Sequence, residues 1–408
     1  MVRPSSTVEV AGVVEVCARE GIAIVPQGGN SSLSGGAVPG TQASIVLSTH
    51  RLDELGAIDD RSLQSTVGAG VTLAALQNTA RRSALFFPID HAARDVATLG
   101  GMAATNAGGS LTLRYGTTRR HVVGLEAVMA DGSTMTHLAG LPKDNTGYDL
   151  TGLFVGNEGT LGVITRLRLQ LTPLLKMRAT ALVGLGSVEA ALDLLATLRR
   201  ELPSLQACEV MFAEGVAAVC AHAGLTPPLR DLHEIHVLID CAAHDDPSVD
   251  LATAVSALPN DDVVIAATED QRTRLWELRE RHNETVNALG VPHKMDVSLP
   301  LDELARFVAE LPAVIPTDAK LICYGHLADG NLHVNVVGPA PEDGSVDAAV
   351  VELVASLGGS ISAEHGIGRA KRDFLHLARS HAEIEAMKAI KRALDPDGIF
   401  NPGVLLPS

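Results

Sequence analysis

Four clusters of glycine lie in the first 170 residues, and the earliest cluster most restricts what this part of the chain can fold into. Residues 28–36 hold four glycines and three serines in nine positions, directly after a strand predicted over 22–25. Glycine allows positive φ and close approach, so the amides of such a loop can surround a diphosphate. The loop has neither the GK[ST] ending of a P-loop nor a GxGxxG pattern. With further clusters at 100–101, 106–109 and 156–162, tight turns alone are a weaker explanation than a large cofactor held by backbone groups.

The composition favours a folded chain of two or three domains that binds neither nucleic acid nor membrane. The 408 residues are 46% hydrophobic and 20% charged, which suits a sizeable core. A formal net charge of -16 repels phosphate backbones and anionic lipid, and 3% aromatic residues are too few for base-stacking surfaces. No stretch approaches the roughly 20 apolar residues of a membrane span. The five cysteines are scattered, odd in number and without a CxxC pair, which is typical of unpaired thiols in the cytoplasm.

The pattern of helices and strands changes near residue 175. In the first part, Ser6 and Glu9 form a capping-box pattern that predicts a helix over about 7–20. From residue 176, strand-like runs alternate with helical stretches, which predicts an antiparallel sheet with helices on one face, an α+β domain. These strands are expected at 178–184, 206–212, 234–241, 263–267, 293–299, 319–327 and 331–337.

Asp329-Gly330 lies between two alternating runs and is a strong signal for a two-residue β-hairpin. In that register His326 and His333 lie directly opposite each other, and Tyr324 and Asn335 form the next pair on the same face. Two imidazoles so placed can chelate one divalent metal ion, with a carboxylate as a third ligand. From the pattern alone, a pair of surface histidines on an ordinary hairpin is an equally good interpretation.

A candidate for the third ligand is Glu364, which stands next to His365 in the glycine-flanked segment 362–369. Such a segment can be a loop whose side chains meet a ligand, although a solvated turn is the commoner meaning. The helical segment 275–281 contains the only tryptophan, and its pattern alone predicts an ordinary amphipathic helix. Lys294 alternates onto one face of a strand, where a solvated charge is the simplest interpretation.

Seven motifs follow one another in a fixed order along the chain. They are Val25–Ser32, Gly100–Gly109, Lys143–Leu150, Gly156–Gly162, the two hairpin histidines, Ala363–Gly366 and Phe400–Gly403. Together they resemble the FAD-linked oxidases of the vanillyl-alcohol-oxidase/PCMH fold (FAD-binding oxidase/transferase type 4), over essentially the whole chain. Within that family they resemble the branch of D-lactate dehydrogenases, glycolate oxidase D subunits and D-2-hydroxyglutarate dehydrogenases, and the last of these most closely.

The resemblance implies an α+β protein with a PCMH-type FAD-binding domain of two α/β subdomains over 1–175. This domain is expected to be N-terminally short, because family members carry a further segment ahead of the part that begins here at Val2. A ferredoxin-like substrate- and metal-binding domain, an antiparallel sheet covered by helices, is expected over 176–390. A C-terminal tail over 391–408 is expected to return to the FAD domain.

The resemblance also implies the site residues. FAD is expected to bind noncovalently, because no histidine lies in the first glycine loop. A divalent metal, usually zinc in this family, is expected on His326, His333 and Glu364. His365 matches the proposed catalytic base and a substrate contact. The other substrate positions match Arg279, Asn283, Lys294 and Asn335. Since Asn283 stands where the hydroxyglutarate enzymes carry threonine, the preferred chain length of the substrate stays open.

The flavin-binding positions implied by the resemblance fall in the glycine clusters and their neighbours. They are Pro26, Gln27, Gly28, Gly29, Asn30, Ser31, Ser32, Pro88, Gly100, Gly101, Ala104, Asn106, Gly108, Gly109, Tyr115, Gly116, Glu158, Gly159, Gly162, Ile164 and Asn401.

The implied activity is FAD-dependent oxidation of a D-2-hydroxy acid, first of all D-2-hydroxyglutarate, to the 2-oxo acid, with metal assistance and hydride transfer to flavin N5. D-lactate or glycolate is the alternative substrate, with the chain acting alone or as a subunit of a larger electron-transfer complex. A non-catalytic binding protein is a remoter alternative. The electron acceptor is expected to be an electron-transfer flavoprotein, a quinone or a cytochrome, and a homodimer is a reasonable base-rate expectation.

Overall fold

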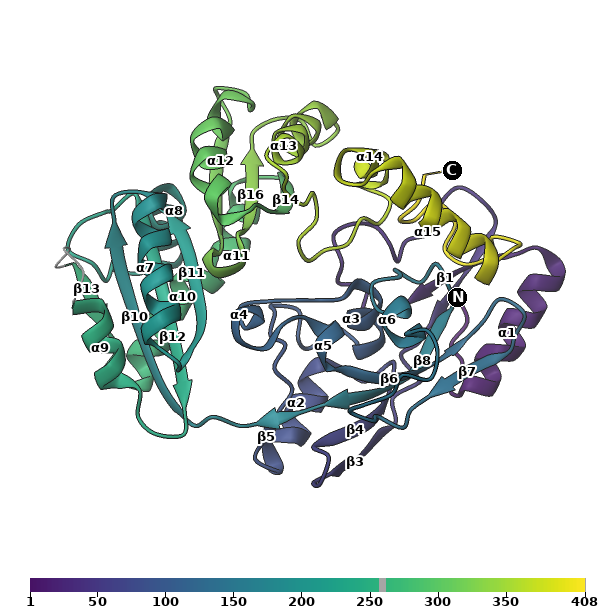
Figure 1. Ribbon diagram of the computed structural model, residues 1–408. Helices are drawn as coiled ribbons and strands as arrows, with labels where there is room; N and C mark the ends of the chain where they lie inside the picture. Colours follow the sequence, from purple (N-terminus) through teal and green to yellow (C-terminus); the bar gives the residue numbers. More distant parts are fainter. Residues whose placement is uncertain (257–261, 408) are drawn as a thin grey trace. The chain divides into compact units, whose positions relative to one another are not determined.

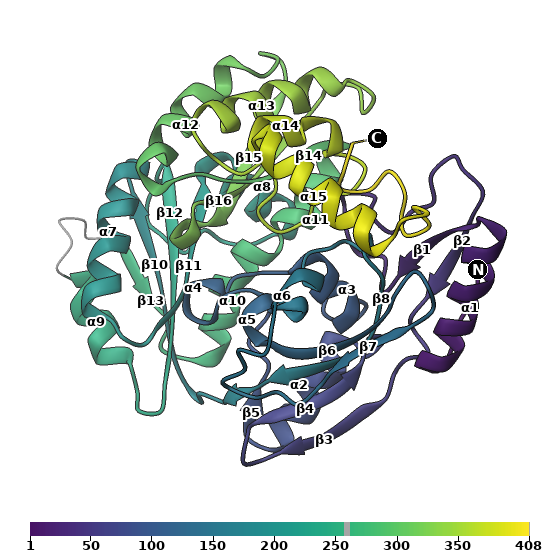
Figure 2. The same ribbon diagram turned by 45° about the vertical axis from the view of Figure 1, so that its right-hand side comes forward.

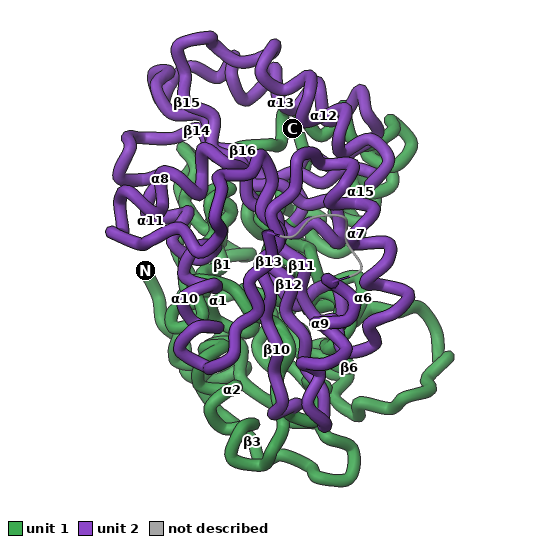
Figure 3. Tube along the Cα trace, turned by 90° about the vertical axis from the view of Figure 1, so that its left-hand side faces the viewer, with its two compact units in different colours: residues 1–109, 116–174, 364–408 green, residues 110–115, 175–363 purple. Residues whose placement is uncertain are grey.

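The computed structural model describes residues 1–256 and 262–407, and the chain forms two compact units (Figure 3). Unit 1 consists of residues 1–109, 116–174 and the chain from 364 onwards, and unit 2 consists of 110–115 and 175–363. The change after residue 174 lies almost at the boundary expected from the sequence. The chain re-enters unit 1 at 364, earlier than the expected tail at 391–408.

Unit 1 is built on a five-stranded sheet with the strand order β3-β4-β8-β6-β7, in which neighbouring strands run antiparallel (Figure 1). Two smaller two-stranded sheets, β1-β2 and β5-β9, complete its strands. Its strands are β1 (Ala23–Gln27), β2 (Ser44–Ser48), β3 (Leu55–Asp59), β4 (Gln64–Gly68), β5 (Leu85–Phe86), β6 (Val122–Val128), β7 (Thr134–His137), β8 (Val163–Gln170) and β9 (Thr172–Pro173). Its helices of five or more residues are α1 (Thr7–Glu20), α2 (Leu73–Arg82), α3 (Leu99–Thr105), α6 (Leu150–Phe154) and α15 (His381–Leu394).

The first helix begins where the sequence predicts, because Ser6 caps it. The Ser6 side chain accepts a hydrogen bond from the Glu9 amide, and Gly21 ends the helix with a φ of 64°. Only half of the predicted capping box forms, since the Glu9 carboxylate accepts from the Ser5 amide at 2.6 Å instead of reaching back to Ser6.

The C-terminal segment pairs with β1 on the side away from β2. Ile24 forms a parallel bridge with Phe400; its amide donates to Ile399 and its carbonyl accepts from the Asn401 amide. The glycine-rich loop of residues 28–36 therefore leaves a strand that is paired on both sides, which gives the loop a fixed base.

Unit 2 is built on a seven-stranded antiparallel sheet with the order β13-β10-β12-β11-β15-β16-β14, and all seven strands predicted from the sequence are in it. The strands are β10 (Met177–Leu185), β11 (Leu205–Phe212), β12 (Ile235–Ala243), β13 (Val263–Ile265), β14 (Pro292–Ser298), β15 (Lys320–His326) and β16 (Asn331–Val337). The main helices are α7 (Val188–Glu201), α8 (Ala213–Ala223), α9 (Ser248–Ser256), α10 (Glu269–Glu280), α11 (His282–Leu289), α12 (Leu304–Glu310) and α13 (Gly344–Ser356). The predicted α+β class is confirmed.

Helices cover both faces of this sheet, so the expectation of one covered face is wrong. Figures 2 and 3 show α7 and α9 against one face and α8, α10 and α11 against the other. The reason lies in the strands, because eight consecutive residues of β12 are buried and so need cover on both sides. Within residues 1–256 and 262–407, no helix is long and apolar enough to cross a membrane.

Candidate active site

The β15–β16 hairpin brings the two candidate ligand histidines onto one face, but in a different register from the predicted one. His326 pairs with Asn331, and Tyr324 pairs with His333. The predicted two-residue turn at Asp329-Gly330 is wrong, because residues 327–329 form a 3₁₀ turn and only Gly330 takes a positive φ, of 70°. His326 and His333 are thus diagonal neighbours instead of lying directly opposite each other. Both side chains still point to the same side of the sheet.

The two imidazoles lie close enough to share an ion. Their ring centroids are 5.5 Å apart, and one ring nitrogen of each lies within 4.8 Å of the other. Nδ1 of His326 lies 2.8 Å from Oε1 of Glu209 on the neighbouring strand. A carboxylate only accepts, so Nδ1 of His326 is the donor and, in the neutral ring, Nε2 carries the lone pair that a metal needs.

Glu209 also holds Arg279, the candidate substrate arginine on α10. Nε of Arg279 donates to Oε2 of Glu209 at 2.7 Å, and its guanidinium lies 4.6 Å from the ring centre of Tyr324. Burial raises the pKa of Glu209, but the charges and hydrogen bonds of His326 and Arg279 outweigh burial and leave this pKa below its ordinary value. Glu209 is therefore ionised although only 1% of it is exposed.

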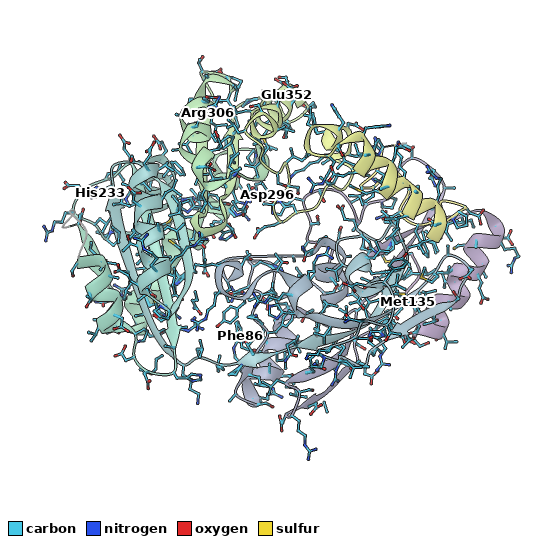
Figure 4. All side chains as sticks on the ribbon, viewed as in Figure 1. Phe86, Met135, His233, Asp296, Arg306 and Glu352 are labelled. Atoms are coloured by element: carbon cyan, nitrogen blue, oxygen red, sulfur yellow. The ribbon has the colours of Figure 1, made fainter. Side chains whose placement is uncertain are left out.

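Three further substrate candidates lie on the same face, on β14, β16 and α11. Lys294 pairs with Asn335 across the sheet, and Asp296 pairs with His333 (Figure 4 labels Asp296). Nζ of Lys294 donates to Oδ1 of Asn283 at 2.7 Å, and burial lowers the pKa of Lys294. Nδ2 of Asn335 donates to backbone carbonyls. Unit 2 thus gathers two imidazoles and two cationic side chains on one sheet face.

The segment that carries Glu364 and His365 follows this sheet directly along the chain. In unit 2, the amide of Ala363 donates to the carbonyl of Asp296 at 3.2 Å, and Ser360 forms a bridge with Ser298. Asp296 pairs with His333, so Ala363 is held at the strand next to a candidate ligand, and Glu364 is the following residue of the chain.

Within unit 1, the 364–368 loop is held from two sides. The hydroxyl groups of Ser32 and Ser34 both donate to the carbonyl of His365, at 3.2 and 2.9 Å. The carboxylate of Glu158 accepts from the amides of Ile367 and Gly368, at 2.8 and 2.7 Å. The Ser32 and Glu158 side chains, both expected to bind flavin, therefore position the loop that carries His365.

The first glycine loop leaves four consecutive amides open. In the part of the chain that the structure describes, no acceptor is found for the amides of Gly29–Ser32. By contrast, the amides of Gly156 and Glu158 donate to the carbonyls of Ala103 and Ala104 on α3. The loop over 28–36 therefore fits a diphosphate, whereas the loop over 156–162 packs on a helix.

The glycines of the other clusters allow close backbone packing in unit 1. A Cβ on Gly100 would lie 2.6 Å from Cβ of Ala69, and one on Gly109 would lie 1.8 Å from the carbonyl oxygen of Asp90. Nδ2 of Asn401 donates to the carbonyls of Gly36 and Glu158, and so ties two glycine loops together. The remaining expected flavin residues also lie in unit 1, except for Tyr115, which belongs to unit 2.

Sequence reasoning did not single out Glu209, His91 or Ser34. Glu209 had a usable signal, because it is the one charged residue in the otherwise uncharged strand Leu205–Phe212. His91 had none. Its pKa is lowered by burial and by the charges of Arg94 and His365, which indicates that it lies near His365.

Two family models match the chain. The model described as "FAD linked oxidases, C-terminal domain" matches residues 174–405, and the model described as "FAD binding domain" matches residues 1–137. The chain is 38% identical to the mitochondrial D-2-hydroxyglutarate dehydrogenase of Bos taurus, over 100% of this chain and 77% of that protein. It is 37% identical to the D-2-hydroxyglutarate dehydrogenase of Xanthomonas citri pv. viticola, over 98% of this chain and 88% of that protein.

Two solved structures of similar fold share much less of their sequence with this chain. p-Cresol methylhydroxylase with substrate bound matches with a TM-score of 0.79 and 18% identity, over 98% of this chain and 87% of that one. 4-Ethylphenol oxidase from Gulosibacter chungangensis matches with a TM-score of 0.75 and 19% identity, over 99% and 88%. At such identities the likeness establishes the fold alone, and it confirms the fold predicted from the sequence.

Proposed function

Because this chain belongs to the FAD-linked oxidases, we propose that it oxidises D-2-hydroxyglutarate to the corresponding 2-oxo acid, with FAD as its cofactor. The observation that carries the choice of substrate is the single sheet face of unit 2 on which Arg279 and Lys294 accompany His326 and His333. Two cationic groups match the two carboxylates of a dicarboxylic acid, whereas D-lactate and glycolate have one.

Residues of unit 1 would hold FAD. The open amides of Gly29–Ser32 suit its diphosphate, and the flanking clusters at 100–109 and 156–162 would line the rest of the cofactor. When bound, FAD supplies the two-electron acceptor that takes a hydride from the hydroxyl-bearing carbon. The binding would be noncovalent, because the first glycine loop contains no histidine.

A divalent metal, with zinc as our first choice, would be held by His326, His333 and Glu364. The fit rests on the donor set, two imidazoles with ring nitrogens within 4.8 Å, one of them oriented by a buried carboxylate. Such an ion supplies a Lewis acid that favours loss of the hydroxyl proton.

The protein's own side chains would bind the substrate and move its proton. Arg279 suits bidentate capture of one carboxylate, and Lys294 would meet the other as a point charge, with Asn335 as a further polar contact. His365 would accept the hydroxyl proton as a general base. Two serine hydroxyls fix its backbone and so help to position the imidazole. The electrons would leave to an electron-transfer flavoprotein, a quinone or a cytochrome.

Five unpaired, buried cysteines support a location in a reducing compartment such as the cytoplasm. The homodimer, the commonest assembly of soluble proteins, is the proposed oligomeric state.

Steady-state kinetics on D-2-hydroxyglutarate, D-malate, D-lactate and glycolate, with an artificial electron acceptor, tests this function. We expect the highest kcat/KM for D-2-hydroxyglutarate, by about tenfold or more over the monocarboxylates, which corresponds to one charge-assisted contact. Removal of metal by a chelator should abolish turnover, and Zn²⁺ should restore it. Preference for D-lactate or glycolate would contradict the substrate, and turnover indifferent to the chelator would contradict the metal.

A further inference from the structure

Glu209 is a buried carboxylate whose two oxygens hold two different parts of the proposed site. Oε1 accepts from Nδ1 of His326 at 2.8 Å, and Oε2 accepts from Nε of Arg279 at 2.7 Å. We propose that Glu209 is a positioning residue that couples the metal ligand His326 to the substrate-binding Arg279. This inference rests on the proposed function, which gives those two residues their roles.

The fold fixes Glu209 in this bridging position. It lies directly opposite His326 in the antiparallel pairing of β11 with β15, so its side chain and the imidazole share one face of the sheet. Arg279 reaches the same carboxylate from α10, which covers that face, and its guanidinium packs over Tyr324, the neighbour of His333. A buried carboxylate with such partners has little freedom to turn away.

The chemistry of the two partners requires an acceptor at both oxygens. The Nε–H of arginine can only donate, and His326 must donate through Nδ1 if Nε2 is to keep its lone pair. An ionised carboxylate meets both requirements at once. Glu209 therefore selects the tautomer of His326 that can bind a metal while it orients Arg279.

A glutamine of nearly the same shape cannot meet both requirements. If its oxygen faces Arg279, its amide N–H₂ faces His326, whose Nδ1 must then accept and whose proton moves to Nε2, which opposes metal binding. If its oxygen faces His326, two donors meet at Arg279, which is displaced from its place. In Glu209→Gln, metal affinity and the KM for substrate cannot both stay at wild-type values.

The test is a Zn²⁺ titration of the full-length flavoprotein, freed of metal by dialysis, in competition with a chromophoric chelator. We expect Glu209→Gln to bind Zn²⁺ about 10- to 100-fold more weakly than wild type, the usual loss when the hydrogen-bond acceptor of a metal-binding histidine is replaced. If the amide takes the other orientation, Zn²⁺ binding is retained and the KM for D-2-hydroxyglutarate rises by a similar factor at saturating Zn²⁺.

Asp240→Asn is the matched control. Asp240 is also 1% exposed, lies on the adjacent strand β12, and accepts from Gln206 and Trp276, with Arg178 and Arg272 nearby. Asp240 is hydrogen-bonded to neither of the two residues that Glu209 joins. Its neutralisation should therefore leave the Zn²⁺ affinity unchanged even where it lowers the thermal stability.

Unchanged Zn²⁺ affinity together with an unchanged KM in folded Glu209→Gln would overturn the inference. If that variant does not fold, Glu209→Asp carries the test, because it keeps the charge but is one methylene too short to reach both partners; wild-type behaviour in both measurements would overturn the inference equally. A wild-type protein that binds no Zn²⁺ is a different result. It would contradict the metal site of the proposed function, and this coupling with it.

Discussion

Lys294 is the residue on which the choice of a dicarboxylic substrate depends. It is half-buried on β14, its pKa is lowered by burial, and its ammonium group donates to Oδ1 of Asn283. An ammonium group in such a place keeps its charge at a cost that a substrate carboxylate would offset.

Lys294→Met tests that role. We expect kcat/KM for D-2-hydroxyglutarate to fall by about 10- to 100-fold, the loss of one charge-assisted hydrogen bond of roughly 1.5–3 kcal/mol, mainly through KM. The kcat/KM for D-lactate should change little, because D-lactate has no second carboxylate. Equal losses for both substrates would assign Lys294 to the shared carboxylate and contradict its proposed role.

At the scale of secondary-structure elements, the loop of residues 364–368 depends on Glu158. The carboxylate of Glu158 accepts hydrogen bonds from the amides of Ile367 and Gly368, and these bonds fix the backbone just after His365. Burial raises the pKa of Glu158, although those two hydrogen bonds act to lower it. The carboxyl group is therefore held by its contacts with the protein and not by water.

Glu158→Ala should loosen this loop without unfolding unit 1. We expect the amides of Ile367 and Gly368 to exchange with deuterium about 5- to 100-fold faster, since each loses a hydrogen bond worth roughly 1–3 kcal/mol when buried. The exposed Glu54 on the same unit offers the control Glu54→Ala, which should leave that exchange unchanged. Unchanged exchange in Glu158→Ala would show that other contacts hold the loop.

The same elements show what the sequence can and cannot predict. Local signals placed the seven strands of unit 2 and the cap of the first helix, because turn residues, alternation and capping act over a few positions. The hairpin register was predicted wrongly, since Asp-Gly also suits a 3₁₀ turn that ends at Gly330. The bridge from Glu209 to His326 spans 117 positions and depends on strand order, which no local pattern specifies.

At the scale of the whole molecule, the two units carry different parts of the proposed chemistry. Unit 1 contains the open amides of Gly29–Ser32 and the loop of His365, and unit 2 contains the hairpin histidines, Arg279 and Lys294. The family motifs predicted separate domains for the first glycine loop and the hairpin histidines, but they placed the loop of His365 with the histidines, in the domain expected over 176–390. The early return of the chain to unit 1 at residue 364 could not be read from them, since it depends on the hydrogen bonds of the 364–368 loop with Ser32, Ser34 and Glu158.

Two buried histidines make the stability of unit 2 depend on pH. Burial, with Arg279 nearby, lowers the pKa of His282 to about 3, and burial, with His233 nearby and partly offset by Asp262, lowers the pKa of His236 to about 4. Because the folded-state pKa values lie below the unfolded value of about 6.5, their contribution to stability is fully present above pH 6.5 and is lost as pH falls towards 4 and 3.

Each of these histidines should therefore lower the free energy of unfolding by about 1.5 kcal/mol between pH 6.5 and pH 5, because the slope approaches roughly 1.4 kcal/mol per pH unit only where the unfolded imidazole is almost fully protonated. Urea unfolding followed at pH 7.5, 6.5, 5.5 and 5 measures the slope. His236→Leu should remove about half of it, whereas the same substitution at the exposed His222 should leave it as in wild type. A flat profile over this range would contradict the burial of both rings as neutral groups.

The most direct test of the central claim is anaerobic mixing of the purified protein with D-2-hydroxyglutarate while the flavin absorbance is recorded. We predict that the flavin absorbance bleaches in wild type, and that His365→Ala retains its flavin but bleaches at least about 100-fold more slowly, as expected for loss of a general base. Bleaching by D-lactate or glycolate but not by D-2-hydroxyglutarate would contradict the proposed substrate. Unchanged bleaching in His365→Ala would contradict the proposed base, and a purified protein without flavin would contradict the account as a whole.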